Sequence, residues 1–403
     1  MPAAAGQTPH NLPGDVKRNP WRVAAAVCIV CLGLGFVVAL YAIGLTDKSA
    51  GARDYIEYWA AGQVLVRGGN PFDPETVFQL ERANGWDKDF PQVSLSPPII
   101  LLLAWPLGHT TPKTGLILWL LASLGCIAAS VGIAWRLYGN SQSSLHLVAF
   151  AFPPALGCMM AGQLGNFFLL EVALFLYLHR SRPWLAGAAL VLFALKPHLF
   201  VPCFFVLLLW SAARKDFRVL AGFLASLAAC CGIVTLLDPQ AWRQYQQMLH
   251  STRITDAFIP TAAVAFRFLV HRQARWLEFL PEAGACLWAV WFFLSRRARW
   301  NWLDEGLLLL LVSLACAPYG WYYDQALLFP AILAGLYRAE HSRISLLLFV
   351  LIAAAGLAGV FGHIQPTSVY YVWTASAWLL WYIFATWVSR SSAVTSEISA
   401  AAV

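Results

Sequence analysis

One carboxylate in this sequence stands where it could take a proton from a hydroxyl group. Asp54 opens the segment Arg53-Asp-Tyr-Ile-Glu-Tyr-Trp59, directly after the first long apolar run. Residues 54–67 are expected to form an amphipathic helix that stops at Gly68-Gly-Asn-Pro71. Asp54 is then either an N-cap that complements the helix dipole or a general base at a membrane surface. Glu57, one turn on, is a second carboxylate on a neighbouring face.

A lysine lies among apolar residues in Phe193-Ala-Leu-Lys-Pro-His-Leu199. An ionisable group at such a depth costs several kcal/mol unless it reaches the interface or has a partner. Lys196 therefore either extends to the interface, or it meets a phosphate group where two short helices join at a proline. His198 is the neighbour best able to share an anion with it.

Two amides occur in Gly162-Gln-Leu-Gly-Asn166, between two apolar segments. The side chains of Gln163 and Asn166 can hydrogen-bond a hydroxylated ligand. They can equally well cap the turn between two helices. The sequence leaves both readings open.

Aromatic residues and a carboxylate stand together in Ala317-Pro-Tyr-Gly-Trp-Tyr-Tyr-Asp324. Tyr319 and Trp321 could stack on a sugar ring, although such residues also form ordinary interface belts. Asp324 begins an apolar segment, where a carboxylate is harder to explain as part of a belt.

Motifs of soluble nucleotide-binding enzymes are absent from the sequence. It contains no P-loop, no GxGxxG after a strand and no HExxH. Asp87-Lys-Asp89 has the spacing of a metal and diphosphate site, but it lies in a polar loop. We therefore expect no metal site and no cofactor. If a group is transferred, a lipid-phosphate donor fits better than a nucleotide sugar.

The composition indicates the elements that must position these residues. Of the 403 residues, 60% are hydrophobic and 12% are charged, and the mean hydropathy is +0.63. Globular chains carry about 25% charged residues, so this chain is expected to lie in a lipid bilayer. The net charge is +7, but Lys and Arg stand singly or in small groups between apolar segments, which argues against nucleic acid as a partner. The nine cysteines lie inside apolar stretches and are expected to be buried hydrophobes.

The predicted fold is an all-α polytopic membrane protein with about twelve spans. The first span is Val23–Leu45, since it has about the 20 residues that a span requires. The later spans are approximately 113–137, 145–161, 164–178, 183–195, 197–213, 218–237, 276–295, 303–317, 324–338, 343–361 and 370–389. Two apolar pieces, Pro97–Gly108 and Ile259–Val270, are too short to cross and are expected to be interfacial or re-entrant.

The positions of the basic residues predict the orientation. Arg180 and Arg182, Arg214 and Lys215, the cluster at 296–299, and the N-terminal Lys17, Arg18 and Arg22 fall on one side. The positive-inside rule makes that side cytoplasmic. The expected organisation is therefore a cytoplasmic N-terminus (1–22), one membrane domain (23–390) with a first outer loop carrying short interfacial helices (46–112), and a cytoplasmic tail (391–403). Every candidate site residue then falls on the outer face.

The order of these motifs resembles glycosyltransferase family 87. The resemblance rests on Asp54-Tyr-Ile-Glu-Tyr-Trp-Ala-Ala61, Gly68-Gly-Asn-Pro-Phe-Asp73, Ser96-Pro-Pro98, Gly162-Gln-Leu-Gly-Asn166, Leu195-Lys-Pro197 and Pro318-Tyr-Gly-Trp321, and it runs from about residue 20 to about residue 390. The family includes mannosyltransferases that use polyprenol-phosphate mannose. It implies a GT-C bundle with an extracytoplasmic site, a lipid-linked sugar phosphate donor and no required metal.

The resemblance also implies roles for two residues. The Asp after the first span is taken as the catalytic base in such enzymes, and here it is Asp54. The Lys of the Lys-Pro motif is Lys196, with a role at the donor phosphate. Mannosyltransferases of the family tend to carry a His in the late outer loop, where this sequence reads Pro318-Tyr-Gly-Trp321. Mannose as the sugar is therefore less strongly implied than hexose transfer.

The expected function is transfer of one hexose from a polyprenyl phosphate to a lipid or glycan hydroxyl, in the cytoplasmic membrane of a bacterium. Asp54 would be catalytic, Lys196 and His198 would bind the phosphate, and the sugar or acceptor would meet Glu57, Gln163, Asn166, Tyr319, Trp321 and Asp324. The rival is a transporter or flippase, because polar intramembrane residues also mark substrate pathways. A transporter usually shows repeated halves, and none is apparent here. A catalytically inactive relative that assists assembly is a third possibility.

Overall fold

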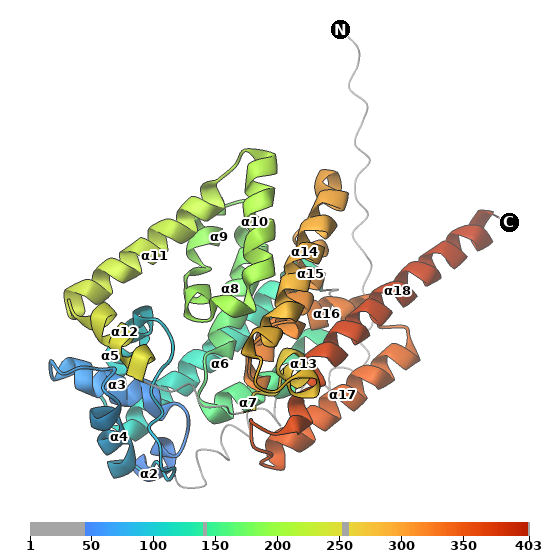
Figure 1. Cartoon of the computed structure of the whole chain (residues 1–403). Helices are drawn as coiled ribbons and strands as arrows, with labels where there is room; N and C mark the ends of the chain where they lie inside the picture. The colour runs from blue at the N-terminus through green and yellow to red at the C-terminus, as the bar shows by residue number, and fades with distance from the viewer. Residues whose placement is uncertain (1–44, 140–142, 252–257, 402–403) are drawn as a thin grey trace, which may run out of the picture.

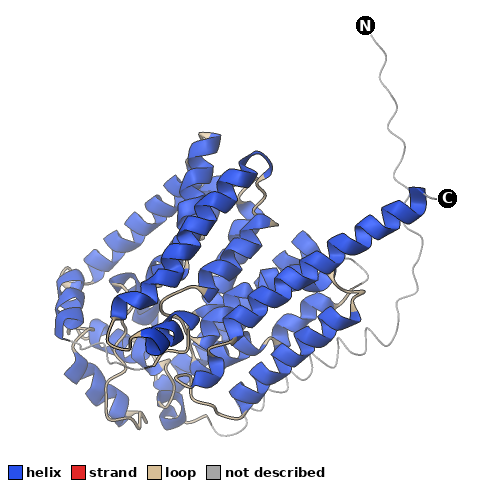
Figure 2. Cartoon of the chain, turned by 45° about the vertical axis from the view of Figure 1, so that its right-hand side comes forward, coloured by secondary structure: helices blue, strands red, loops and turns tan. Residues whose placement is uncertain are grey.

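The computed structural model describes residues 45–139, 143–251 and 258–401. The predicted N-terminal tail and all but the last residue of the first span lie outside the described residues. Within the described ranges every regular element is a helix, and Figure 2 shows helices joined by loops without a strand. The all-α prediction is confirmed for this part of the chain.

The α-helices follow one another with short connections. They are α2 (Asp47–Gly51), α3 (Ile56–Val66), α4 (Pro74–Ala83), α5 (Leu101–Leu107), α6 (Pro112–Tyr138), α7 (Pro153–Ala161), α8 (Gly165–Leu178), α9 (Pro183–Ala188), α10 (Val201–Arg214), α11 (Arg218–Leu237), α12 (Ala241–Ser251), α13 (Ala262–Val270), α14 (Phe279–Arg296), α15 (Glu305–Ala315), α16 (Phe329–Arg338), α17 (Arg343–Phe361) and α18 (Thr374–Ala401). The 3₁₀ helices are η1 (Pro98–Ile100), η2 (Leu145–Ala151), η3 (Val191–Leu195), η4 (Pro197–Leu199), η5 (Arg275–Glu278), η6 (Arg297–Arg299), η7 (Tyr322–Leu328) and η8 (Val369–Tyr371).

The helix ends agree with the start and stop signals in the sequence. At the start of α6, the Thr111 side chain accepts a hydrogen bond from the Thr114 backbone N–H, and Pro112 takes the first helical position. α6 then continues to Tyr138, one residue beyond the predicted segment at each end. Prolines stand at the start of α7, α9 and η4, which explains why many apolar segments are broken into short helices.

Four helical segments are long and apolar enough to cross a membrane. They are Pro112–Tyr138, Arg218–Leu237, Arg275–Arg299 and Arg343–Phe361. Six further apolar segments have 10–17 residues, which at 1.5 Å per residue falls short of a hydrocarbon core of about 30 Å. The count of about twelve spans therefore stays a prediction. The Pro98–Leu107 segment is among the short helices, together with segments that were predicted to span, so the expectation that it does not cross also stays a prediction.

Helix α3 differs from its prediction. Ile56–Gly62, Val64 and Leu65 are all buried, so the helix has no solvent-facing stripe and is not amphipathic. The reason is that α4, α5 and α6 all pack against it. Gly62 permits the closest approach, since a Cβ there would stand 2.1 Å from the carbonyl oxygen of Ala104 on α5.

The short helices gather at one end of the bundle. Figure 1 shows α2, α3, α4 and α5 with α12 at the lower left and α13 near the lower middle, while the turn between α10 and α11 lies at the top. The turn between α10 and α11, which is predicted to be cytoplasmic, therefore lies at the opposite end of the molecule from the helices of the predicted outer loop 46–112 (Figure 1).

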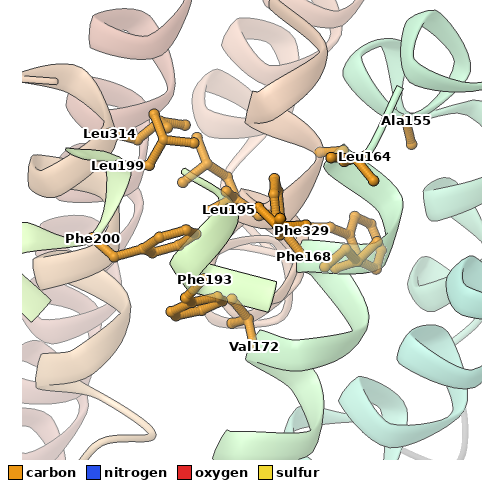
Figure 3. Close-up of a cluster of buried hydrophobic side chains, with 14 of the residues drawn as sticks. Ala155, Leu164, Phe168, Val172, Phe193, Leu195, Leu199, Phe200, Leu314 and Phe329 are labelled. Atoms are coloured by element: carbon orange, nitrogen blue, oxygen red, sulfur yellow. The ribbon is translucent and has the colours of Figure 1, made fainter. Parts of the chain in front are cut away.

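A buried aromatic cluster fixes the segment around Lys196. The Phe193 and Phe200 rings stack with their centroids 3.5 Å apart, and Phe168 of α8 meets Phe200 edge to face. Figure 3 shows these rings with Leu195 and Leu199 in one cluster. The chain therefore doubles back between residues 193 and 200, and Lys196 lies on the bend.

Candidate active site

Asp54 is held by two side chains from distant parts of the chain. Its Oδ2 accepts a hydrogen bond of 3.0 Å from the Tyr323 hydroxyl and one of 3.2 Å from Gln163 Nε2. The N-cap of α3 is Tyr55, and no side chain caps it. The structure therefore does not support the capping reading of Asp54. Its carboxylate belongs to a tertiary network instead.

The turn after α7 presents Gln163 to that network. Gly162 ends the helix with φ of +74°, a conformation that favours glycine, and a Cβ there would stand 2.5 Å from Cβ of Tyr55. The Tyr55 backbone N–H donates to the Ala161 carbonyl at 3.1 Å. These contacts join the start of α3 to the end of α7. Gln163 is 6% exposed and lies where the two helices meet.

Lys196 is paired inside the protein. Its Nζ lies 2.7 Å from Oδ1 of Asp324, and the two side chains are 10% and 0% exposed. Oδ2 of Asp324 accepts a hydrogen bond of 2.9 Å from the Trp321 backbone N–H. Burial opposes the charge of Lys196, but Asp324 outweighs it and raises the pKa of the lysine. Lys196 therefore stays charged in a buried ion pair and does not extend to an interface.

Consecutive residues connect the two halves of the site. Tyr323 donates to Asp54, while Asp324 binds Lys196. One short segment, the start of η7, thus positions both the base candidate and the buried cation. Tyr323 was not among the predicted site residues, although it lies inside the Pro318–Asp324 motif. Its position directly before Asp324 was the only signal in the sequence that could have indicated it.

The aromatic residues that were predicted to line the site lie beside the Lys196 and Asp324 pair. Trp321 Nε1 donates to the Tyr319 hydroxyl at 2.8 Å, and the Tyr319 ring meets the His198 ring edge to face at 5.3 Å. The imidazole of His198 can hydrogen-bond an anion near Lys196.

Glu57 faces the same region from α3. It is 8% exposed, and Asp54 and Lys196 both act on its charge. Burial raises the pKa of Glu57 to about 8. The two carboxylates at the start of α3 therefore have different environments, as the sequence alone could not indicate.

Asn166 is the predicted site residue that the structure places elsewhere. Its Nδ2 donates to Ser123 Oγ at 2.8 Å and to the Ala155 carbonyl at 3.1 Å, and the residue is fully buried. These bonds join α6, α7 and α8. Asn166 therefore takes part in helix packing through its Nδ2, and its predicted contact with a ligand stays a prediction.

The described residues offer no ready metal site. No group of three or more His, Cys, Asp or Glu side chains arranged to hold an ion occurs in residues 45–139, 143–251 and 258–401.

Comparison with known proteins adds one finding. The model of glycosyltransferase family 87 matches residues 95–339. The match includes Gln163, Lys196, His198 and the Tyr319–Asp324 segment, and it begins after Asp54 and Glu57. No curated protein and no solved structure matches the chain.

Proposed function

Because the chain belongs to glycosyltransferase family 87, we propose that it transfers a single hexose from a polyprenyl-phosphate sugar to a hydroxyl group of a lipid or glycan acceptor. The reaction takes place at the extracytoplasmic face of a bacterial cytoplasmic membrane. The observation that carries the proposal is the network in which Tyr323 and Asp324, adjacent in sequence, hold Asp54 and Lys196.

Asp54 is suited to be the general base. Both of its side-chain hydrogen bonds reach Oδ2, and no group in the described part of the chain bonds Oδ1. A carboxylate oriented through one oxygen keeps the other for an incoming hydroxyl group. Asp54 is also partly exposed, whereas Asp324 has both oxygens engaged and no exposure.

Lys196 is suited to bind the donor phosphate. A charged ammonium in a water-poor site stabilises negative charge that builds on a leaving group. In the proposed step the acceptor oxygen forms a bond to the anomeric carbon as the bond from that carbon to the phosphate oxygen breaks. The acceptor proton passes to Asp54, and the electron pair stays on the polyprenyl phosphate beside Lys196. The anomeric configuration is inverted.

The decisive test replaces the base. Asp54→Asn keeps the size and the hydrogen bonds of the side chain but cannot take a proton, so we expect transfer to fall by about 10²-fold or more. The assay incubates membranes with polyprenyl-phosphate hexoses and follows acceptor-dependent consumption of the donor. Asp89→Asn, at a fully exposed carboxylate of the same region, is the matched control and should keep full activity.

The variant must remain folded and inserted, which its thermal midpoint in detergent will show. Undiminished turnover by a folded Asp54→Asn protein would remove Asp54 from the mechanism. No consumption of any polyprenyl-phosphate hexose by the unaltered protein would contradict the proposed donor.

A further inference from the structure

Two buried polar side chains hold the backbone of the bend that carries Lys196. Glu171 of α8 is 5% exposed, and its Oε1 accepts a hydrogen bond of 2.6 Å from the Leu192 backbone N–H of η3. Ser313 of α15 has no exposed surface, and its hydroxyl donates to the Leu199 carbonyl of η4 at 2.7 Å. The bend is therefore bound by α8 before Lys196 and by α15 after it.

The bend needs such partners because the helix is broken there. Pro197 has no backbone N–H, and Lys196 has a non-helical φ of −137°. A break of this kind leaves backbone N–H and C=O groups without partners in the helix, and apolar surroundings supply no water to bind them. Side chains of neighbouring helices are the remaining source of partners. Glu171 supplies an acceptor, and Ser313 supplies a donor.

The two bound backbone groups lie next to the stacked rings that close the bend. Phe193 follows Leu192, Phe200 follows Leu199, and the ring centroids are 3.5 Å apart. The Lys196 backbone N–H in turn donates to the Phe193 carbonyl at 3.2 Å. A shift of either bound group therefore displaces the whole bend, and with it the point from which the Lys196 side chain starts.

We propose that Glu171 and Ser313 are positioning residues of the transfer, which place the Lys196 ammonium group where it meets the phosphate of the donor. The inference rests on the proposed function and adds the residues through which α8 and α15 act on donor binding. Neither side chain touches the donor in this role. A carboxylate inside an apolar segment is costly, and its bond to the backbone of the bend accounts for its presence in α8.

The test measures the affinity of the full chain in detergent for a polyprenyl phosphate without a sugar. Glu171→Leu and Ser313→Ala each leave one backbone group of the bend without its partner. We expect the affinity to fall about tenfold in the first variant and severalfold in the second. Glu171→Gln keeps an oxygen that accepts the Leu192 N–H, so it should bind as tightly as the unaltered protein.

Glu81→Leu is the matched control. Glu81 of α4 is also fully buried, and its Oε2 accepts a hydrogen bond of 2.9 Å from the Gln92 backbone N–H. The loop that Glu81 holds does not carry Lys196. Glu81→Leu should therefore lower the thermal midpoint as Glu171→Leu does, and it should leave the affinity for polyprenyl phosphate unchanged.

The dependence on Lys196 is measured in the double variant Lys196→Met with Asp324→Leu. The ammonium group is absent from that protein, so adding Glu171→Leu should cause no further loss of affinity. An equal loss with and without the ammonium group would overturn the positioning role, because Glu171 would then affect donor binding independently of Lys196.

Three other results would also overturn the inference. They are a folded Glu171→Leu protein with unaltered affinity, a Glu171→Gln protein that loses as much affinity as Glu171→Leu, and an equal loss in Glu81→Leu. If Glu171→Leu does not fold, unaltered affinity of Ser313→Ala overturns the inference instead. Failure of the unaltered protein to bind polyprenyl phosphate would contradict the proposed donor itself, so the two failures can be told apart.

Discussion

At the scale of single residues, the Lys196 and Asp324 pair has a structural role and, in the proposed function, also a chemical one. A buried ion pair contributes little net stability, but removal of one partner leaves an uncompensated charge in the interior. Asp324 has no exposed surface, and its second oxygen also holds the Trp321 backbone. The position of the Lys196 ammonium group and the conformation of the loop before η7 therefore depend on the same carboxylate.

This dependence predicts how a single substitution and a compensating double substitution differ. Asp324→Asn should lower the free energy of unfolding by about 3–5 kcal/mol, because Lys196 would stay charged and unpaired. The double variant Lys196→Met with Asp324→Leu should recover most of that loss and remain inactive. Thermal midpoints in detergent and transfer assays on the same samples give the answer. A double variant that recovered activity together with stability would show that the ion pair is only structural.

At the scale of elements, α3 matters because it carries Asp54 and Glu57 against three neighbouring helices. Its closest contact is with α5, where Gly62 faces the Ala104 carbonyl and Gly108 faces the Gly62 carbonyl. Backbones approach so closely only where no Cβ intervenes. The position of the carboxylates therefore depends on glycines one to two turns away.

Gly62→Ala should accordingly separate α3 from α5. We expect a loss of about 1–3 kcal/mol in the free energy of unfolding, typical of overpacking, and a marked loss of transfer. Gly125→Ala in α6 is the control, because a Cβ there would meet nothing within 4 Å and alanine favours a helix. Equal thermal midpoints for the two variants would contradict the importance of this contact.

At the scale of the whole molecule, the distribution of the basic residues predicts the orientation. The turn between α10 and α11 carries Arg214, Lys215 and Arg218, and it lies at the opposite end of the bundle from α2–α5 (Figure 1). The positive-inside rule places such a turn in the cytoplasm. This supports an outer site, which the proposed use of a lipid-phosphate donor requires.

Labelling with a membrane-impermeant maleimide on intact cells tests the orientation. Asp89→Cys should react from outside, and Lys215→Cys should react only after the membrane is opened. The native thiols described by the structure are free and lie in apolar segments, so the unaltered protein supplies the background. Reaction of residue 89 from the cytoplasmic side alone would contradict the extracytoplasmic site.

Much of this could be predicted from the sequence because it depends on local chemistry. Apolar runs with capping residues and prolines give helices at the predicted places, as for α6, α11 and α17. A carboxylate directly after an apolar run and a lysine inside one can be recognised in the sequence, because an ionisable group at such a position costs free energy unless it has a partner. Asp54, Lys196 and Asp324 were selected in this way, and the motif order indicated the family to which the chain belongs.

Only the tertiary structure decided which of these residues meet. Residues 54 and 323 are 269 positions apart, and Lys196 and Asp324 are 128 positions apart, so no periodicity relates them. The burial of α3, the hydrogen bonds of Asn166 between helices and the contact of Tyr323 with Asp54 arise from helix packing. The carboxyl groups of Asp54 and Glu57 are chemically alike in the sequence, and only the packing of the helices decides that Glu57 is buried while Asp54 is partly exposed and bonded to Gln163 and Tyr323.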